Sequence, residues 1–384
     1  MCRCTIARAH KCTPAYKDHR SLRAHASWLL WPPKRKTQQL DKATRQLLMR
    51  MPGTAPEWLF LLLALVGGVT AAVSSLRLLR YLALCLRRPR DLRRRYGAWA
   101  VVTGPTSGIG RSVALELARR GLNLVLLDID AANLRETSDT IRSRDAVKTR
   151  TLVFDLSLVG TPQGDESMRR LRAAIDGLDV GLLVNNAGMA NPFLAYFHEA
   201  DVEAWLRMVR VNLWALTEVA AAVLPGMVER GRGAVLNMGS ASSEGMPSFP
   251  LNTIYASTKK YVAVFSRSLY VEYRSKGIDV QCQAPMFVAT RIVPNILRDK
   301  WYLSPLLSTT ADAYARAAVR WIGHGAICNP NLSHQLQRCL LAIVPETALD
   351  WCLLQFVRRL RAESRGVLAR VGAVGNGTDR KNSM

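Results

Sequence analysis

Hydrophobic positions divide the chain into one long uncharged run near the N-terminus and a later series of short apolar runs. From about residue 97 the short runs alternate with longer amphipathic stretches, which is typical of parallel strands connected by helices. The pattern predicts strands at 99–102, 124–127, 151–154, 181–184, 234–238 and 279–283. Helices are expected at 111–119, 202–224 and 255–275. The sequence therefore predicts an α/β fold built on a doubly wound parallel sheet.

The long apolar run is WLFLLLALVGGVTAAVSSL, residues 58–76, which contains no charge. As a helix it would be roughly 28 Å long, close to the thickness of a bilayer core. It is longer than the core of a signal peptide, and no small-residue cleavage site lies after it. Arginines are frequent between residues 77 and 95, which favours a cytosolic location for the C-terminal part of the chain. We expect an N-terminal transmembrane helix.

The first 50 residues are basic and poor in acids. They have the composition of a transit peptide, or of a translated upstream extension ahead of a natural start at Met51, and we favour the extension and expect it to be unstructured. Residues 51–96 would then be the anchor and its basic flank, and 97–300 the catalytic domain. The remainder, 301–384, would be a helical region near substrate and membrane.

Within that last region, helices are expected at 311–321 and 340–360. The second contains Glu346 and Asp350, so it fits a membrane surface better than a membrane span.

The net charge of +24 first suggests nucleic acid or an anionic membrane. Most of the excess lies in the first 100 residues, around the hydrophobic run, so we expect the membrane and no nucleic acid. Eight cysteines are scattered without a common zinc spacing. We therefore expect reduced thiols facing the cytosol and no metal.

A glycine-rich loop, Thr103-Gly104-Pro105-Thr106-Ser107-Gly108-Ile109-Gly110, lies between the first strand and its helix. Glycines allow a sharp turn and close approach of a pyrophosphate to the helix N-terminus. Strand, loop and helix occur in the order of a Rossmann-type dinucleotide site. The expected contacts are Thr103, Gly104, Ser107, Gly108, Ile109 and Gly110.

Polar residues also lie at the ends of the next three strands. Asp128 could accept hydrogen bonds from an adenosine ribose, or it could be the N-terminal acid of the next helix. Asp155 could meet the adenine edge, or be a solvated loop acid. The motif Asn185-Asn186-Ala187-Gly188 predicts further cofactor contacts at Asn185, Ala187 and Gly188, because glycine permits close backbone approach.

Tyr255 and Lys259 are four residues apart at the start of a predicted helix and share one face. A free tyrosine has a pKa of about 10, and a neighbouring ammonium lowers that pKa by stabilising the phenolate. The pair therefore indicates acid–base chemistry beside the dinucleotide.

Together with Ser240, these motifs resemble the short-chain dehydrogenase/reductase family over about residues 97–300. The stretches GLDVGLLVNNAGMANPFLAYFHE and GIDVQCQAPMFVATR are most similar to the very-long-chain 3-oxoacyl-CoA reductases of plant type, which are related to 17β-hydroxysteroid dehydrogenases. The resemblance implies that Tyr255 donates a proton. Lys259 would hold the nicotinamide ribose and lower the tyrosine pKa.

The same resemblance implies that Asn212 holds a water in the proton relay, Ser240 polarises the carbonyl and Thr290 contacts the nicotinamide amide. The usual serine-to-tyrosine spacing would select Ser242, whereas the motif Asn237-Met238-Gly239-Ser240 selects Ser240, which we prefer.

The cofactor is less clearly indicated. Asp128-Ile129 stands where many close relatives carry a neutral residue and an arginine that binds the 2′-phosphate of NADP, so the local residues favour NAD. The subfamily favours NADPH, and Arg111 could neutralise a phosphate. We expect NADPH, with NADH also possible.

The expected function is NAD(P)H-dependent reduction of 3-oxoacyl-CoA to 3-hydroxyacyl-CoA in very-long-chain fatty acid elongation, in the endoplasmic reticulum membrane with the catalytic domain facing the cytosol. Acyl-CoA, membrane lipid and other elongase subunits are the expected partners. A hydroxysteroid or other lipid-alcohol dehydrogenase is the alternative. A catalytically silent scaffold is disfavoured by the intact Ser240, Tyr255, Lys259 and Asn212.

Overall fold

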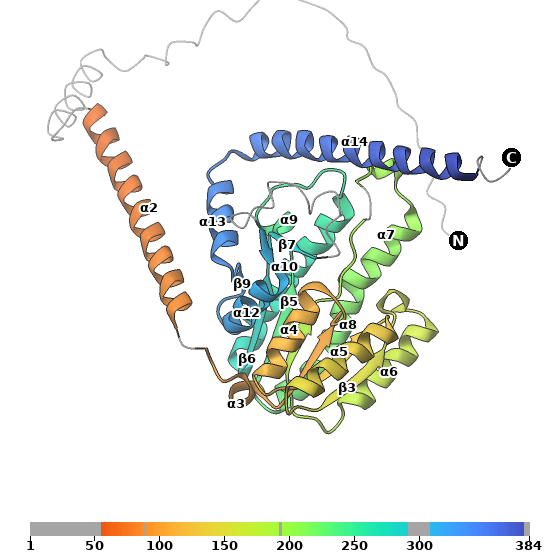
Figure 1. Ribbon diagram of the computed structural model, residues 1–384. Coiled ribbons are helices and arrows are strands. Elements are labelled where there is room, and N and C mark those ends of the chain that lie inside the picture. Colours follow the sequence, from red (N-terminus) through yellow and green to blue (C-terminus); the bar gives the residue numbers. More distant parts are fainter. Residues whose placement is uncertain (1–54, 88, 192–193, 291–307, 380–384) are drawn as a thin grey trace, which may run out of the picture. The chain divides into compact units, whose positions relative to one another are not determined.

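A computed structural model describes residues 55–87, 89–191, 194–290 and 308–379, with side chains described as far as Ser364. The chain divides into two units, Met1–Leu86 and Arg87–Met384. The described part of the first unit is helix α2 (Ala55–Leu86), drawn at the left of Figure 1. Residues 1–50 lie outside the described part of the chain.

Helix α2 contains the whole uncharged run 58–76, so the prediction that this run is helical is confirmed. The stretch Pro56–Leu86 is 31 residues long and has a mean hydropathy of 2.2. It is therefore long and apolar enough to cross a bilayer.

The second unit is built on a seven-stranded sheet in the order β3-β2-β1-β4-β5-β6-β9, in which every neighbouring pair is parallel. Its strands are β1 (Trp99–Thr103), β2 (Asn123–Asp128), β3 (Thr149–Val153), β4 (Val180–Asn185), β5 (Gly233–Met238), β6 (Ile278–Gln283) and β9 (Ile327–Cys328). The six predicted strands are confirmed. The strand order reverses between β1 and β4, which is where open α/β sheets bind their ligands.

Helices cover both faces of the sheet (Figure 1). One core packs α4 (Gly108–Arg119), α5 (Ala131–Arg144) and α12 (Ala311–Trp321) against it. The other packs α6 (Pro162–Ile175), α8 (Leu216–Glu229) and α10 (Thr253–Tyr273). The predicted doubly wound architecture is therefore confirmed.

The helix expected at 202–224 is interrupted. It consists of α7 (Val202–Val209), a π-helix at Arg210–Ala215, and α8. A π-helix widens the turn by one residue and is frequently found at functional sites. Here it contains Asn212, whose side chain is buried.

The second unit begins before residue 97. Helix α3 (Leu92–Tyr96) belongs to it, because Leu92 and Tyr96 are buried in the first core. The Tyr96 hydroxyl also donates to Asp279 Oδ2 at 2.6 Å. The residues expected to be a flank of the anchor therefore form part of the folded unit.

The unit does not end at residue 300 either, since α12 packs on the first core. The bounds predicted for a helix at 340–360 are wrong. Two helices are found, α13 (Leu332–Leu341) and α14 (Glu346–Asp379). Pro345 explains the break, because proline has no backbone N–H and disfavours a helical conformation in the residue before it.

Candidate active site

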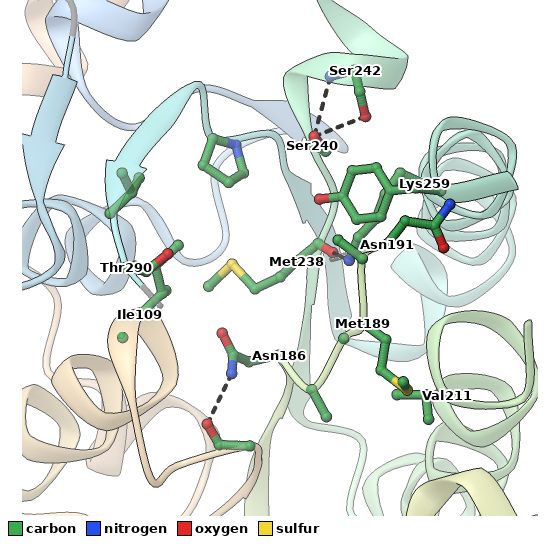
Figure 2. A pocket seen from close by; sticks show the side chains of 18 of the residues that line it. Ile109, Asn186, Met189, Asn191, Val211, Met238, Ser240, Ser242, Lys259 and Thr290 are labelled. Atoms are coloured by element: carbon green, nitrogen blue, oxygen red, sulfur yellow. Dashed lines mark hydrogen bonds between the residues drawn. The ribbon is translucent and has the colours of Figure 1, made fainter. Parts of the chain in front are cut away.

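A cavity of about 860 Å³ lies at the carboxyl ends of the strands (Figure 2). Its lining includes Gly104 after β1, Asn186 after β4 and Ser240 after β5. The cavity thus lies at the strand-order reversal that the topology marks as a ligand site.

The glycine-rich loop forms one wall. Gly104, Ser107, Gly108, Ile109 and Gly110 all line the cavity. A Cβ added at Gly110 would lie 2.0 Å from the Gly104 oxygen and 2.3 Å from Asn186 Nδ2, and Gly104 has a φ of +68°. The backbone can make this tight cradle only with glycine at these positions. The cradle at the start of α4 fits a dinucleotide pyrophosphate.

Thr103 and Asn185 lie beneath the cavity and are not among its lining residues. Thr103 Oγ1 accepts from the backbone N–H groups of Asn186 and Ala187, each at 3.0 Å. Asn185 Nδ2 donates to Asn237 Oδ1 at 2.9 Å. Both side chains therefore bond the ends of the strands and do not line the cavity.

The residue of this motif that the sequence did not single out is Asn186. It lines the cavity with Ala187 and Gly188, and its Nδ2 donates to the backbone oxygens of Thr103 and Gly104, each at 3.1 Å. Two adjacent asparagines gave no sign of which one faces the site.

The two predicted acids both line the cavity. Asp128 accepts from Thr106 Oγ1 at 2.7 Å and from the Asp130 N–H at 3.2 Å. The N-cap of α5 is Asp130, so Asp128 does not cap that helix. Asp155 accepts from the N–H and hydroxyl of Ser157 at 2.9 and 2.7 Å. Ile129 is 61% exposed beside Asp128.

Ser240 and Tyr255 come together across the cavity from Thr290 and the glycine-rich loop. Ser240 caps the short helix α9 (Ala241–Glu244), and its Oγ accepts from the N–H and hydroxyl of Ser242 at 3.1 and 2.9 Å (Figure 2). Ser240 also hydrogen-bonds Tyr255. Of the two candidate serines, Ser240 is the one that bonds Tyr255, and Ser242 bonds Ser240.

Burial raises the pKa of Tyr255 above its usual value, and the hydrogen bond with Ser240 opposes that rise. The lowering expected from Lys259 is not found. Lys259 Nζ donates to the Met238 oxygen at 2.9 Å and lies 5.8 Å from the centroid of the Tyr255 ring. The ammonium thus lies over the ring face and not at the hydroxyl. Tyr255 is consequently a protonated phenol at neutral pH.

Lys259 is itself only 5% exposed. Its burial lowers the pKa of the ammonium to about 8, and the nearby Cys282 opposes that change. A buried cation with one carbonyl partner has donors left for a ligand.

Asn212 is brought to the same region but does not line the cavity. Its Oδ1 accepts from the Met189 N–H at 2.7 Å, while its Nδ2 donates to the Met189 oxygen at 2.9 Å and to Thr258 Oγ1 at 3.1 Å. The side chain joins the loop after β4 to helix α10. Thr290 lines the cavity, next to Gly108.

A further part of the lining is mainly apolar, and sequence patterns gave no signal for it. Its residues come from loops and from the C-terminal helix: Met189, Leu194, Met246, Phe249, Met286, Phe287, Phe356, Val357 and Leu360. His334 of α13 supports this wall, because its Nδ1 accepts from the Met286 N–H and its Nε2 contacts the Phe287 oxygen, both at 3.3 Å.

Comparisons with known proteins agree with this geometry. Residues 98–301 match the short chain dehydrogenase family. A very-long-chain 3-oxoacyl-CoA reductase-like protein of Arabidopsis thaliana is 42% identical over 71% of this chain and 86% of its own length. The very-long-chain 3-oxoacyl-CoA reductase of Rattus norvegicus is 35% identical over 77% and 93%.

Among solved structures, a short-chain dehydrogenase from Sphingobium yanoikuyae in complex with NADPH has a TM-score of 0.53 and 27% identity, over 65% of this chain and 96% of its own. The structure agrees with these matches. Its sheet is parallel, its glycine-rich loop forms a cradle, and a serine, a tyrosine and a lysine lie together at one cavity. The chain belongs to the short-chain dehydrogenase/reductase family of nicotinamide-dependent oxidoreductases.

Proposed function

We propose that the protein reduces the 3-oxo group of an acyl-CoA to a 3-hydroxyl group in very-long-chain fatty acid elongation. The observation that carries the proposal is the hydrogen-bonded pair Ser240–Tyr255 beside Lys259, next to an apolar part of the cavity. The names of the Arabidopsis and rat relatives, matched over most of their lengths, support the substrate class.

The site residues suit the direction of reduction. A bound reduced nicotinamide would supply hydride to the carbonyl carbon, and the carbonyl oxygen must then gain a proton. Tyr255 holds that proton at neutral pH because burial raises its pKa. Ser240, which bonds Tyr255, is in position to donate to the same oxygen as negative charge develops there. Lys259, which has donors left over after its bond to the Met238 oxygen, would hold the nicotinamide ribose.

Asn212 would act by holding neighbouring groups of the site in place. Its amide holds the Met189 backbone and Thr258, and it lies in the π-helix, a feature frequently found at functional sites. We assign to this segment the water of the proton relay that returns a proton to Tyr255.

The proposed cofactor is NADPH, with NADH tolerated. The carboxylate of Asp128 would repel a 2′-phosphate, because both groups are negative. That carboxylate, however, already accepts hydrogen bonds from the Thr106 hydroxyl in the glycine-rich loop and from the Asp130 N–H. The NADPH complex of the Sphingobium enzyme supports the phosphorylated cofactor. The test is kcat/KM for NADPH and NADH in wild type and in Asp128→Ala, Ile129→Arg. A wild-type preference for NADH of tenfold or more, reversed in the double variant, contradicts NADPH.

The proposed location is the endoplasmic reticulum membrane, with the catalytic unit on the cytosolic side. Helix α2 would supply the span, and the arginines among residues 77–95 favour the cytosol for the second unit. The names of the relatives fit a protein of the elongation system, so acyl-CoA, membrane lipid and other elongase subunits are the proposed partners.

The experiment measures reductase activity of the full chain in membranes, with a 3-oxoacyl-CoA and with a steroid ketone. Tyr255→Phe removes the proton donor, and turnover on the 3-oxoacyl-CoA should fall by about 10²–10⁴. Tyr261→Phe is the matched control on the same helix, since its hydroxyl bonds only Thr217 among the described residues, at 2.9 Å. Reduction of the steroid but not the acyl-CoA contradicts the proposed substrate, and full turnover in Tyr255→Phe contradicts the proposed role.

A further inference from the structure

Helix α14 contributes one stripe of side chains to the cavity. Phe356, Val357, Leu360 and Ser364 line it, and positions 356, 360 and 364 lie at four-residue intervals along one face of the helix. Val357 and Leu360 are 0% and 6% exposed. This face is therefore inside the protein, although it lies about a hundred residues beyond Tyr255 in the sequence.

Two polar contacts hold α14 against loops of the active site. Ser248 Oγ donates to Asp350 Oδ1 at 2.5 Å, and Ser248 lies between Ser240 and Tyr255 in the sequence. Next to Leu360, Arg361 donates to the Glu199 carboxylate at 2.7 Å, and its guanidinium lies 4.8 Å from the centroid of the Tyr196 ring.

The Arg361 side chain is only 10% exposed, so this contact is much less screened by solvent than a surface ion pair. Phe356, Val357 and Leu360 lie between Asp350 and Arg361 in the sequence. The two contacts therefore hold this part of α14 against the loops that carry Ser248 and Glu199.

The walls around the stripe have the chemistry of a hydrocarbon site. Met246, Phe249, Met286 and Phe287 contribute apolar side chains to the same cavity. The α14 stripe adds three more apolar side chains and one hydroxyl, and no charge. An alkyl chain gains free energy from leaving water at every methylene in such surroundings.

We propose that the cavity-facing stripe of α14 binds the acyl chain of the substrate and that the bulk of Leu360 sets the preferred chain length. This proposal rests on the proposed 3-oxoacyl-CoA reductase function. Leu360 occupies the middle of the stripe, one turn from Phe356 and one turn from Ser364. A larger side chain there shortens the space available to the chain, and a smaller one extends it.

The test compares kcat/KM for 3-oxohexadecanoyl-CoA and 3-oxodocosanoyl-CoA in full-length wild type, Leu360→Trp and Leu360→Ala. One methylene of misfit is worth roughly 10-fold or more in discrimination. Leu360→Trp should therefore lower the long-to-short ratio of kcat/KM at least about tenfold, and Leu360→Ala should raise it. The control is Arg359→Trp, which puts the same bulk at an exposed neighbouring position of α14 and should leave the ratio unchanged.

The outcomes separate this proposal from the one on which it rests. A wild-type protein that reduces neither substrate contradicts the reductase function. A wild-type protein that reduces both, with the same ratio in Leu360→Trp and Leu360→Ala, overturns the role of α14. Should Leu360→Trp not fold, Ser364→Phe adds bulk at a half-buried position of the same stripe, and an unchanged ratio there has the same meaning.

Discussion

The stability of the protein should depend on pH through Lys259, and replacing this residue with methionine isolates the effect. Burial lowers the pKa of Lys259 from 10.5 to about 8 in the folded protein. Between these two values the unfolded chain holds the proton and the folded protein does not. Unfolding then takes up a proton, so raising the pH through this window stabilises the folded state.

The magnitude comes from the difference of about 2.5 pKa units, each worth about 1.36 kcal/mol. Wild type should gain about 3 kcal/mol in free energy of unfolding relative to Lys259→Met as the pH rises from 8 to 10.5. Other groups that titrate in this range are present in both proteins, so the difference between them reports Lys259. Turnover should be lost in the variant at every pH.

The assay is denaturant unfolding of the full chain in detergent without cofactor, monitored by tryptophan fluorescence at a series of pH values. Lys260→Met is the control, because Lys260 is 61% exposed and pairs with Glu244 at 3.1 Å. A difference between wild type and Lys259→Met that stays constant across the window would refute the reasoning, since the lysine would then have the same pKa in both states.

Three further predictions concern the cradle, the serine and the anchor. Gly110→Ala forces a Cβ to within 2.0 Å of the Gly104 oxygen, so the loop must move by about 1 Å or more, and dinucleotide affinity measured by calorimetry should fall about 100-fold. Ser240→Ala should lower turnover by about 10²–10³ and Ser242→Ala by less; the opposite ranking in steady-state kinetics identifies Ser242 as the catalytic serine. Alkaline carbonate should not extract the full chain from membranes, and recovery in the supernatant would show that α2 is not a span.

Most of the sheet could be predicted from the sequence because its central strands contain short apolar runs, such as residues 99–102 in β1 and 124–127 in β2. Strand β9 could not, since its two residues join the sheet through only two register pairs with β6, Cys282–Ile327 and Gln283–Cys328. A strand of two residues is too short to show an alternation of apolar and polar positions. It forms because the edge of β6 offers hydrogen bonds.

The site was predictable where chemistry requires a particular residue type, as at Gly110 and Tyr255. It was not predictable where the fold decides between equivalent residues, as with the two adjacent asparagines after β4. The π-helix also has no local signature, because the helical pattern of 202–224 continues through it. The apolar wall from α14 depends on tertiary packing between distant segments, which no periodicity within α14 reveals.

The dependence of the cavity on α14 has a consequence for biosynthesis. A chain is made from its amino end, so α2 leaves the ribosome first and the stripe around Leu360 near the end. Until then the apolar part of the cavity, which includes Met246 and Phe249, lacks the side chains that α14 contributes to it. We therefore expect chains that lack α14 to expose this apolar lining to solvent.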